Sequence, residues 1–234
     1  MLHELPECLE KEEWVSLSGE DEHAYFRLLQ SMNLMALRQA TLGTPTSADG
    51  KLKRLHEILQ EYLEGGQKVV IFSYFLKTLD SVGDLVGKHY RIEHYRIDGS
   101  VSASQRMSNI DDFQRESGFG VLLAQLLSGG VGINLQAASS VVLVEPQLKP
   151  TTEWQAIKRV HRMGQTRRVV VHRLLARNTV DEGLWTMLHR KTETSDQYAR
   201  ESAVKRASFA AIETTTAEVE RNLISAALAH AGSA

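Results

Sequence analysis

The fold is decided by residues 68–100, KVVIFSYFLKTLDSVGDLVGKHYRIEHYRIDGS. A short apolar run rich in β-branched residues opens this stretch at 69–72, and such a run is typical of a strand covered on both faces. Apolar residues then recur at helical spacing over 76–88, and residues 90–97 are typical of a second strand. A strand, a helix and a strand in this order favour parallel pairing, because parallel neighbours need a crossover connection.

The same alternation extends to both sides of this stretch. Further strands are predicted at 121–123, 141–144 and 169–171, further helices at 18–41, 52–63, 102–114 and 151–162, and a glycine turn with a short helix between 123 and 141. The tail after 179 is spaced for helices alone. We therefore expect an α/β fold, a doubly wound parallel sheet with N-terminal helices and a C-terminal helical extension. Its expected parts are a helical lead-in at 1–66, a lobe at 67–178, and a helical brace and tail at 179–234.

Composition excludes several classes of protein. The chain has 234 residues, 42% hydrophobic and 24% charged, which is ordinary for a globular protein and unlike a disordered one. Cys8 is the single cysteine, so an internal disulfide and a thiolate zinc site are both excluded, and a reduced cytoplasmic compartment is expected. No His or carboxylate cluster has metal-ligand spacing. Because the net charge is -2, any nucleic-acid contact must come from a local basic patch.

Membrane association is not expected. Four of the first twelve residues are acidic, so no signal peptide is predicted there. The most apolar segment, 120–144, is broken by polar residues and glycines, and is better interpreted as two buried strands around a turn than as a membrane span.

Two segments carry the candidate chemistry. The first, SGGVGINLQAAS at 128–139, sets three glycines beside Asn134 and Gln136. Glycines let the backbone approach a ligand closely, and their N–H groups can form an anion nest; a tight turn without a ligand is the alternative interpretation. The segment is not a Walker A loop, because no Gly-Lys pair in the chain is followed by Ser or Thr.

The second segment is WQAIKRVHRMGQTRR, residues 154–168. On a helix, Gln155, Arg159 and Arg162 lie at i, i+4 and i+7, so they share one stripe. Because ligands of parallel sheets bind outside the carboxyl ends of the strands, we expect both guanidinium groups at that edge, facing a triphosphate. A bidentate cationic fork suits the charge that develops on a γ-phosphate. A solvated basic face is the alternative.

Four segments in order resemble one known family. They are KVVIFSYF (68–75), YRIDGSVSASQR (95–106), SGGVGINLQAASSVVLVEP (128–146) and EWQAIKRVHRMGQ (153–165). Together they are similar to the C-terminal RecA-like lobe of the Swi/Snf-type helicase-like ATPases, over residues 68 to about 185. In that family ATP lies between two RecA-like lobes, and the resemblance therefore implies a RecA-like fold for this lobe.

The resemblance also implies roles for individual residues. In motif VI, Arg162 and Arg159 match the catalytic arginines, with Arg162 as the arginine finger. The residues expected near the nucleotide are Gln155, His161, Gly130, Gly132 and Asn134. The residues expected near the DNA backbone are Ser73, Asp98, Gly99, Ser100, Arg106, Gly129, Gln136 and Lys149.

This chain departs from the family pattern at two places. Gln125-Leu126 replaces the usual Ser-Thr before the motif V glycines, so a hydroxyl available for DNA contact is missing. Leu148-Lys149-Pro150 replaces the usual Trp-Asn-Pro, and there Lys149 is expected to meet a phosphate in place of an aromatic contact.

The expected activity follows from what the sequence lacks. ATP hydrolysis needs a phosphate-cradling loop with its lysine and carboxylates for Mg²⁺, and no segment here supplies them. We expect half of a DNA-dependent ATPase that translocates on duplex DNA. It would be inactive alone, binding ATP and Mg²⁺ only when joined to an N-terminal RecA-like lobe, and would hold double-stranded DNA through the phosphate backbone.

The sequence also indicates a cellular location and leaves one alternative function open. The absence of a strong basic import signal favours a bacterial cytoplasm, with association to the nucleoid, or a nucleus if the source is eukaryotic. The rival is a stand-alone, non-enzymatic RecA-like module that binds nucleic acid or a partner ATPase. Arg159 and Arg162 would then be plain surface cations.

Overall fold

The computed structural model describes residues 5–90, 92, 94–126, 133–201 and 217–231. Six strands form one all-parallel sheet in the order β1-β6-β5-β2-β4-β3. The strands are β1 (Cys8–Val15), β2 (Lys68–Ser73), β3 (Tyr95–Ile97), β4 (Gly120–Gln125), β5 (Ser140–Leu143) and β6 (Val169–Ala176). The described helices are α1 (Gly19–Leu29), α2 (Leu34–Ala40), α3 (Lys51–Glu64), α4 (Leu76–Tyr90), α5 (Ala103–Arg115), α6 (Pro150–Val160), α7 (Val180–Glu201) and α9 (Ala217–Ala231). The expected α/β fold with a doubly wound parallel sheet is confirmed.

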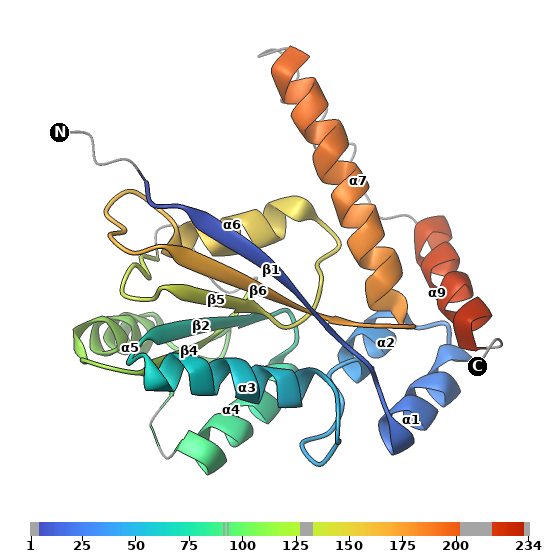
Figure 1. Cartoon of the computed structure of the whole chain (residues 1–234), viewed down its shortest axis with the longest axis horizontal. Helices are drawn as coiled ribbons and strands as arrows, with labels where there is room; N and C mark the ends of the chain where they lie inside the picture. Colours follow the sequence, from blue (N-terminus) through green and yellow to red (C-terminus); the bar gives the residue numbers. More distant parts are fainter. Residues whose placement is uncertain (1–4, 91, 93, 127–132, 202–216, 232–234) are drawn as a thin grey trace.

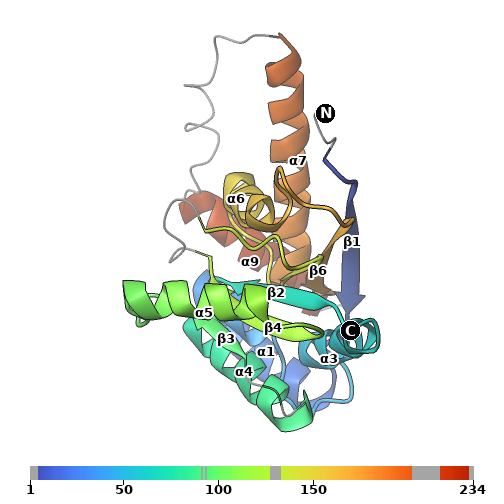
Figure 2. The same ribbon diagram turned by 90° about the vertical axis from the view of Figure 1, so that its left-hand side faces the viewer.

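Helices cover both faces of the sheet, as Figures 1 and 2 show. On one face α5 and α6 pack on the strands, with Phe113 and Ile157 against Val70 and Leu143. On the other face lie α3 and α4. The central strands β2, β4 and β5 are apolar on both faces and almost completely buried, as a two-sided parallel sheet requires.

The two flanks of the lobe pack on each other. Helices α1, α2 and α9 and the first turns of α7 share a third apolar cluster, in which Tyr25 and Leu37 from the N-terminal side meet Leu184 and Ile224 from the C-terminal side. The Tyr25 hydroxyl accepts the Val180 N–H at 2.8 Å. We call this unit the helical end. From it, α7 extends past the sheet on the side of α6 (Figure 1).

The expected lead-in at 1–66 is not purely helical, because it contains the edge strand β1. Its pairing with β6 runs from Cys8 opposite Val169 to Val15 opposite Ala176. The sequence CLEKEEWV has no apolar run, since an edge strand buries little, and no strand was predicted here. Inside the structure, however, Glu13 is buried against His172 of β6, with a distance of 2.7 Å between its carboxylate and the ring Nδ1.

Other differences concern where elements end. The helix predicted over 18–41 is two helices, since Met32 takes a φ of 51° and the Asn33 side chain caps α2 by accepting the Ala36 N–H. The strand expected at 90–97 is reduced to β3, because α4 continues to Tyr90. The described residues 133–139 contain no helix. Helix α6 ends at Val160.

Some expectations lie outside the described residues, among them those for Gly129, Gly130 and Gly132. Within the described part of the chain, no helix has the length and apolar character needed to cross a bilayer.

Candidate functional site

Helix α6 carries the motif VI residues away from the carboxyl edge of the sheet. It starts after β5, at that edge, and returns antiparallel to the strands before β6 begins. Eleven residues at about 1.5 Å each span about 16 Å, enough to cross the sheet. Arg159 therefore lies in the last turn of α6 at the amino edge, and Arg162 lies in the turn that follows. Placing both arginines at the carboxyl edge, on one helical stripe, was wrong.

The turn that holds Arg162 is fixed from inside by Gln165, whose side chain is buried. Its amide NH₂ donates to the carbonyls of Val160 (3.2 Å), Ala138 (2.9 Å) and Gln136 (3.2 Å). Its amide oxygen accepts the N–H groups of Thr166 and Arg167, both at 3.0 Å. One side chain thereby joins the end of α6, the segment before β5 and the segment before β6.

Gln136 ties the same turn to the end of motif V. Its amide NH₂ donates to the Met163 carbonyl, and its amide oxygen accepts from the Asn134 side chain at 2.9 Å. Gly164 has a φ of +95°, and a Cβ there would come within 2.8 Å of the Gln136 amide nitrogen. Only glycine lets the turn approach so closely. Gln136 was expected near DNA, but the structure places it at the amino edge beside Arg162.

The two arginines differ in their surroundings. Arg162 is exposed, and none of the described residues forms a hydrogen bond or ion pair with its guanidinium. Arg159 is half-buried, and burial lowers the pKa of its guanidinium, which nevertheless stays charged. Its carbonyl accepts the Leu135 N–H at 2.9 Å, a second link to motif V.

The other described residues that were expected near the nucleotide lie in different places. Asn134 lies at the amino edge with the arginines through its bond to Gln136. Gln155 is exposed on the middle of α6. His161 contacts the N-terminal segment, because its Nε2 lies 2.6 Å from the Pro6 carbonyl and donates to it. The expectation that His161 faces the nucleotide does not fit this contact.

At the carboxyl edge, two of the residues expected near DNA are buried. Ser73 is completely buried, and its hydroxyl lies 3.0 Å from a carboxylate oxygen of Glu145. Asp98 is 1% exposed, and its carboxylate accepts from the Ser100 N–H at 2.8 Å and from the Arg96 guanidinium. Both side chains shape their loops from inside, so neither is available to a phosphate. Asp98 would also repel one.

The remaining candidates do lie on this edge. Gly99 and Ser100 are exposed just after β3. Arg106 is half-buried on α5 and donates to the Asp98 carbonyl at 3.3 Å. Lys149 is exposed at the start of α6. The ends of β3 and β5 are three strand spacings apart, about 14 Å at about 4.8 Å each, so the two groups would meet different phosphates.

Known proteins resemble this chain in sequence and in fold. The helicase conserved C-terminal domain matches residues 50–164. The chain is 37% identical over 134 residues, 57% of its length, to the chromatin-remodeling ATPase INO80 of Emericella nidulans, and 36% identical over 144 residues, 62% of its length, to that of Arabidopsis thaliana. It also resembles the Sulfolobus solfataricus SWI2/SNF2 ATPase core domain, with a TM-score of 0.68 and 26% identity over 92% of this chain and 46% of that one. The chain is a helicase C-terminal lobe of the Swi/Snf family.

One solved structure resembles nearly the whole of this chain. The C-terminal part of the Fun30 ATPase domain has a TM-score of 0.76 over 96% of this chain and 99% of that chain, at 17% identity, which shows a shared fold. The chain spans only 8% and 9% of the two INO80 proteins. The comparisons give no support to the expected association with a bacterial nucleoid.

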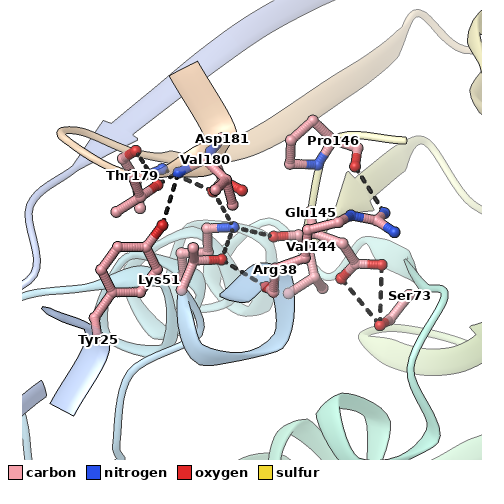
Figure 3. Close-up of polar contacts among 12 residues, drawn as sticks. Tyr25, Arg38, Lys51, Ser73, Val144, Glu145, Pro146, Thr179, Val180 and Asp181 are labelled. Atoms are coloured by element: carbon pink, nitrogen blue, oxygen red, sulfur yellow. Dashed lines mark hydrogen bonds and ion pairs between the residues drawn. The ribbon is translucent and has the colours of Figure 1, made fainter. Parts of the chain in front are cut away.

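A buried polar network ties the Swi/Snf lobe to its two flanks (Figure 3). Lys51 is 1% exposed and donates to Asp181 at 2.6 Å, to the Thr41 hydroxyl at 2.9 Å and to the Val144 carbonyl at 3.0 Å. Arg38 is 2% exposed and donates to the Pro146 carbonyl at 2.9 Å. The N-terminal helices, the loop after β5 and the start of α7 thus meet around two buried cations.

Sequence reasoning missed this network, although a signal was present. Lys51 lies at i, i+4 and i+7 with Leu55 and Ile58, on the apolar face of α3, and Arg38 follows Leu34 by four residues in the same way. A cation on an apolar helical stripe indicates a buried partner, because an unpaired buried charge is costly. The partner itself, Asp181, lies 130 residues from Lys51 in the sequence (181 minus 51), and no local pattern identifies it.

Proposed function

We propose that this lobe is the C-terminal half of an ATP-driven motor on duplex DNA, and that it presents Arg162, with Arg159, to an ATP molecule held by a second RecA-like lobe. The observation that carries the proposal is the turn after α6. Its backbone is fixed by Gln136 and Gln165, while the Arg162 guanidinium projects from it without an acidic partner among the described residues. A fixed backbone with an exposed cation suits a group that acts on a ligand outside its own lobe.

The chemistry of the arginines fits a triphosphate. Charge builds on the γ-phosphate oxygens as phosphoryl transfer proceeds, and a planar guanidinium can donate two hydrogen bonds to them. A preorganised donor stabilises that charge with little rearrangement. The 234 residues contain no Walker A sequence, so the phosphates and Mg²⁺ would be held by the second lobe, in the same polypeptide or in another.

The opposite edge of the sheet would contact DNA. Gly99 offers a backbone N–H group, and Arg106 and Lys149 offer two cations, which hold phosphates without reading bases. The Ser100 N–H and hydroxyl donate to Asp98, at 2.8 Å and 2.6 Å, and shape this turn from inside. The solved Sulfolobus solfataricus SWI2/SNF2 ATPase core in complex with dsDNA supports this part of the proposal, since a protein of the same fold binds duplex DNA. Nucleotide and DNA would then meet opposite edges of one sheet.

The test compares the isolated chain with a two-lobe protein, in which the chain is joined to the lobe that carries the phosphate-binding loop. The isolated chain is expected to hydrolyse no ATP, and the two-lobe protein is expected to hydrolyse ATP faster when duplex DNA is added. Arg162→Ala should lower kcat by about 10³-fold. Arg168→Ala is the matched control, because Arg168 pairs with Glu7 at 3.1 Å on the surface, and it should retain activity.

Two results would contradict the proposal. ATP hydrolysis by the isolated chain at enzyme rates would show that the lobe is not half of the site. Equal activity in Arg162→Ala and Arg168→Ala would show that Arg162 is a surface cation, as the non-enzymatic alternative requires.

A further inference from the structure

Helix α6 begins with a buried carboxylate. Glu153 is 5% exposed and lies in the first turn, on the face that packs on the sheet. One of its oxygens accepts from the Arg173 Nε at 2.8 Å, and the other accepts the backbone N–H of Gln147 at 3.0 Å. Both oxygens are therefore engaged, each by a different part of the lobe.

On one side, Arg173 connects Glu153 to the flanks of the lobe. Arg173 is 7% exposed in the middle of β6, and its Nη1 donates to Glu10 of β1 at 2.7 Å. Its guanidinium carbon lies 5.1 Å from the centre of the Trp185 ring on α7, within the range of a cation–π contact. The first turn of α6 is thus held to the edge strand and to α7 by one buried guanidinium.

On the other side, Gln147 connects Glu153 to the loop after β2. The Gln147 side chain donates to the Glu145 carbonyl at 2.8 Å and to its carboxylate at 3.3 Å. That carboxylate accepts from the Ser73 hydroxyl and from the Tyr74 N–H (Figure 3 shows the Ser73 contact). Every member of this chain of contacts is buried except Tyr74.

The relay, defined as Ser73, Glu145, Gln147, Glu153 and Arg173, joins the carboxyl edge to α6, the helix whose last turn carries Arg159. Lys149 is two residues beyond Gln147 and is an exposed cation at that edge. A displacement of the loop at 145–149 by DNA would act directly on the first turn of α6. Because a helix is stiff, such a displacement would reach the arginines about 16 Å away.

We propose that Glu153 is a positioning residue that couples DNA contact at the carboxyl edge to the arginines at the amino edge. This inference rests on the proposed function, and adds to it the route by which DNA stimulates ATP hydrolysis. A buried polar network is stiff when every member has its hydrogen-bond partner, and losing one member is costly. A displacement at one end of the relay would therefore be passed to the other end. Glu153 itself touches neither ligand.

The test uses the two-lobe protein and measures ATP hydrolysis with and without a duplex oligonucleotide. Glu153→Gln replaces one carboxylate oxygen with an NH₂ group, which only donates. One acceptor oxygen then remains for two donors, the Arg173 Nε–H and the Gln147 N–H. We expect the stimulation by DNA to fall about fivefold or more, a typical coupling between two sites, while kcat and KM for ATP without DNA stay within about twofold. Gln147→Met breaks the next link while keeping every charge, and should lower the stimulation in the same way.

Glu182→Gln is the matched control. Glu182 lies in the first turn of α7, and its carboxylate forms no hydrogen bond or ion pair with any described residue, so DNA stimulation should be unchanged. Thermal unfolding of each variant shows whether it is folded, and Gln147→Met decides the matter if Glu153→Gln does not fold. Full stimulation in folded variants would overturn the inference, as would an equal fall of the rates with and without DNA. Absence of stimulation in the unmodified two-lobe protein would instead overturn the proposed function.

Discussion

Replacing Asp181 with Asn is expected to destabilise the lobe more than any surface change. The carboxylate is completely buried, and it lies 2.6 Å from the Lys51 ammonium, which is itself 1% exposed. The substitution Asp181→Asn would keep the size of the side chain and an acceptor for the Ala176 N–H, now at 3.1 Å from the carboxylate. It would leave the buried ammonium with two neutral acceptors, the Thr41 hydroxyl and the Val144 carbonyl.

The magnitude follows from the burial of both partners. Removing one member of a buried ion pair costs about 3–5 kcal/mol, because the other charge stays in a region of low dielectric. For a chain of this length about 1 kcal/mol shifts the Tm by about 2–4 °C, so a decrease of about 6–20 °C is expected. Lys51→Met should cost a similar amount. The double variant should be more stable than the sum of the two losses implies, by about 2 kcal/mol or more, because no unpaired charge remains.

Urea unfolding, followed by circular dichroism, measures all four proteins of this double-mutant cycle. The reasoning is refuted if Asp181→Asn lowers the free energy of unfolding by less than about 1 kcal/mol, the range of an exposed pair. It is also refuted if the two losses simply add, since additivity would mean that the two side chains do not interact.

Three further outcomes are expected. Gly164→Ala should lower the free energy of unfolding by about 1–3 kcal/mol, because the position has a φ of +95° and the new methyl would lie 2.8 Å from the Gln136 amide nitrogen. Gly87→Ala, in α4, places its methyl where no neighbouring atom lies within 4 Å, and should raise the free energy of unfolding by about 0.5–1 kcal/mol; urea unfolding compares the two variants. Burial lowers the pKa of His172, so the unfolded state binds the proton more tightly than the folded state, and the free energy of unfolding should be full above about pH 6.5 and fall as the pH is lowered. His172→Gln should flatten this dependence of stability on pH, and an unchanged dependence would mean that other groups cause it. Lys149→Ala should weaken duplex DNA binding equally across sequences and reduce the slope of log affinity against log salt by about 1, and an unchanged slope would show that no phosphate contacts this lysine.

Strands buried on both faces could be predicted from the sequence, whereas the edge strand could not. The run at 69–72 and the run at 141–144 are apolar because helices cover both sides of the sheet there. Strand β1 has only one neighbour, and three of its middle residues are exposed, so its sequence resembles a polar loop. The break at Met32 was missed for another reason, since no glycine or proline marks it.

The residue types of the candidate site could be predicted, but not the edge at which they lie. Helical spacing places Gln155 and Arg159 on one face of a helix, yet it does not tell where the helix ends, and α6 ends before Arg162. Asp98 is held by near neighbours, Arg96 and Ser100, whereas the burial of Ser73 depends on a distant partner, Glu145, 72 residues away. Such partners follow from the topology of the sheet rather than from local pattern.

The pairing of β1 with β6 leaves β1 without its partner during much of the synthesis of the chain. Its partner β6 lies 161 residues later, since Cys8 pairs with Val169, and at about 5–20 residues per second a ribosome needs roughly ten to thirty seconds to synthesise the intervening chain. During that interval the first strand must wait with all its main-chain groups unpaired. Its run of Glu10, Lys11, Glu12 and Glu13 keeps the waiting segment hydrated and discourages pairing with another nascent polypeptide. The acidic character that hides the strand from pattern recognition therefore protects the molecule before it is complete.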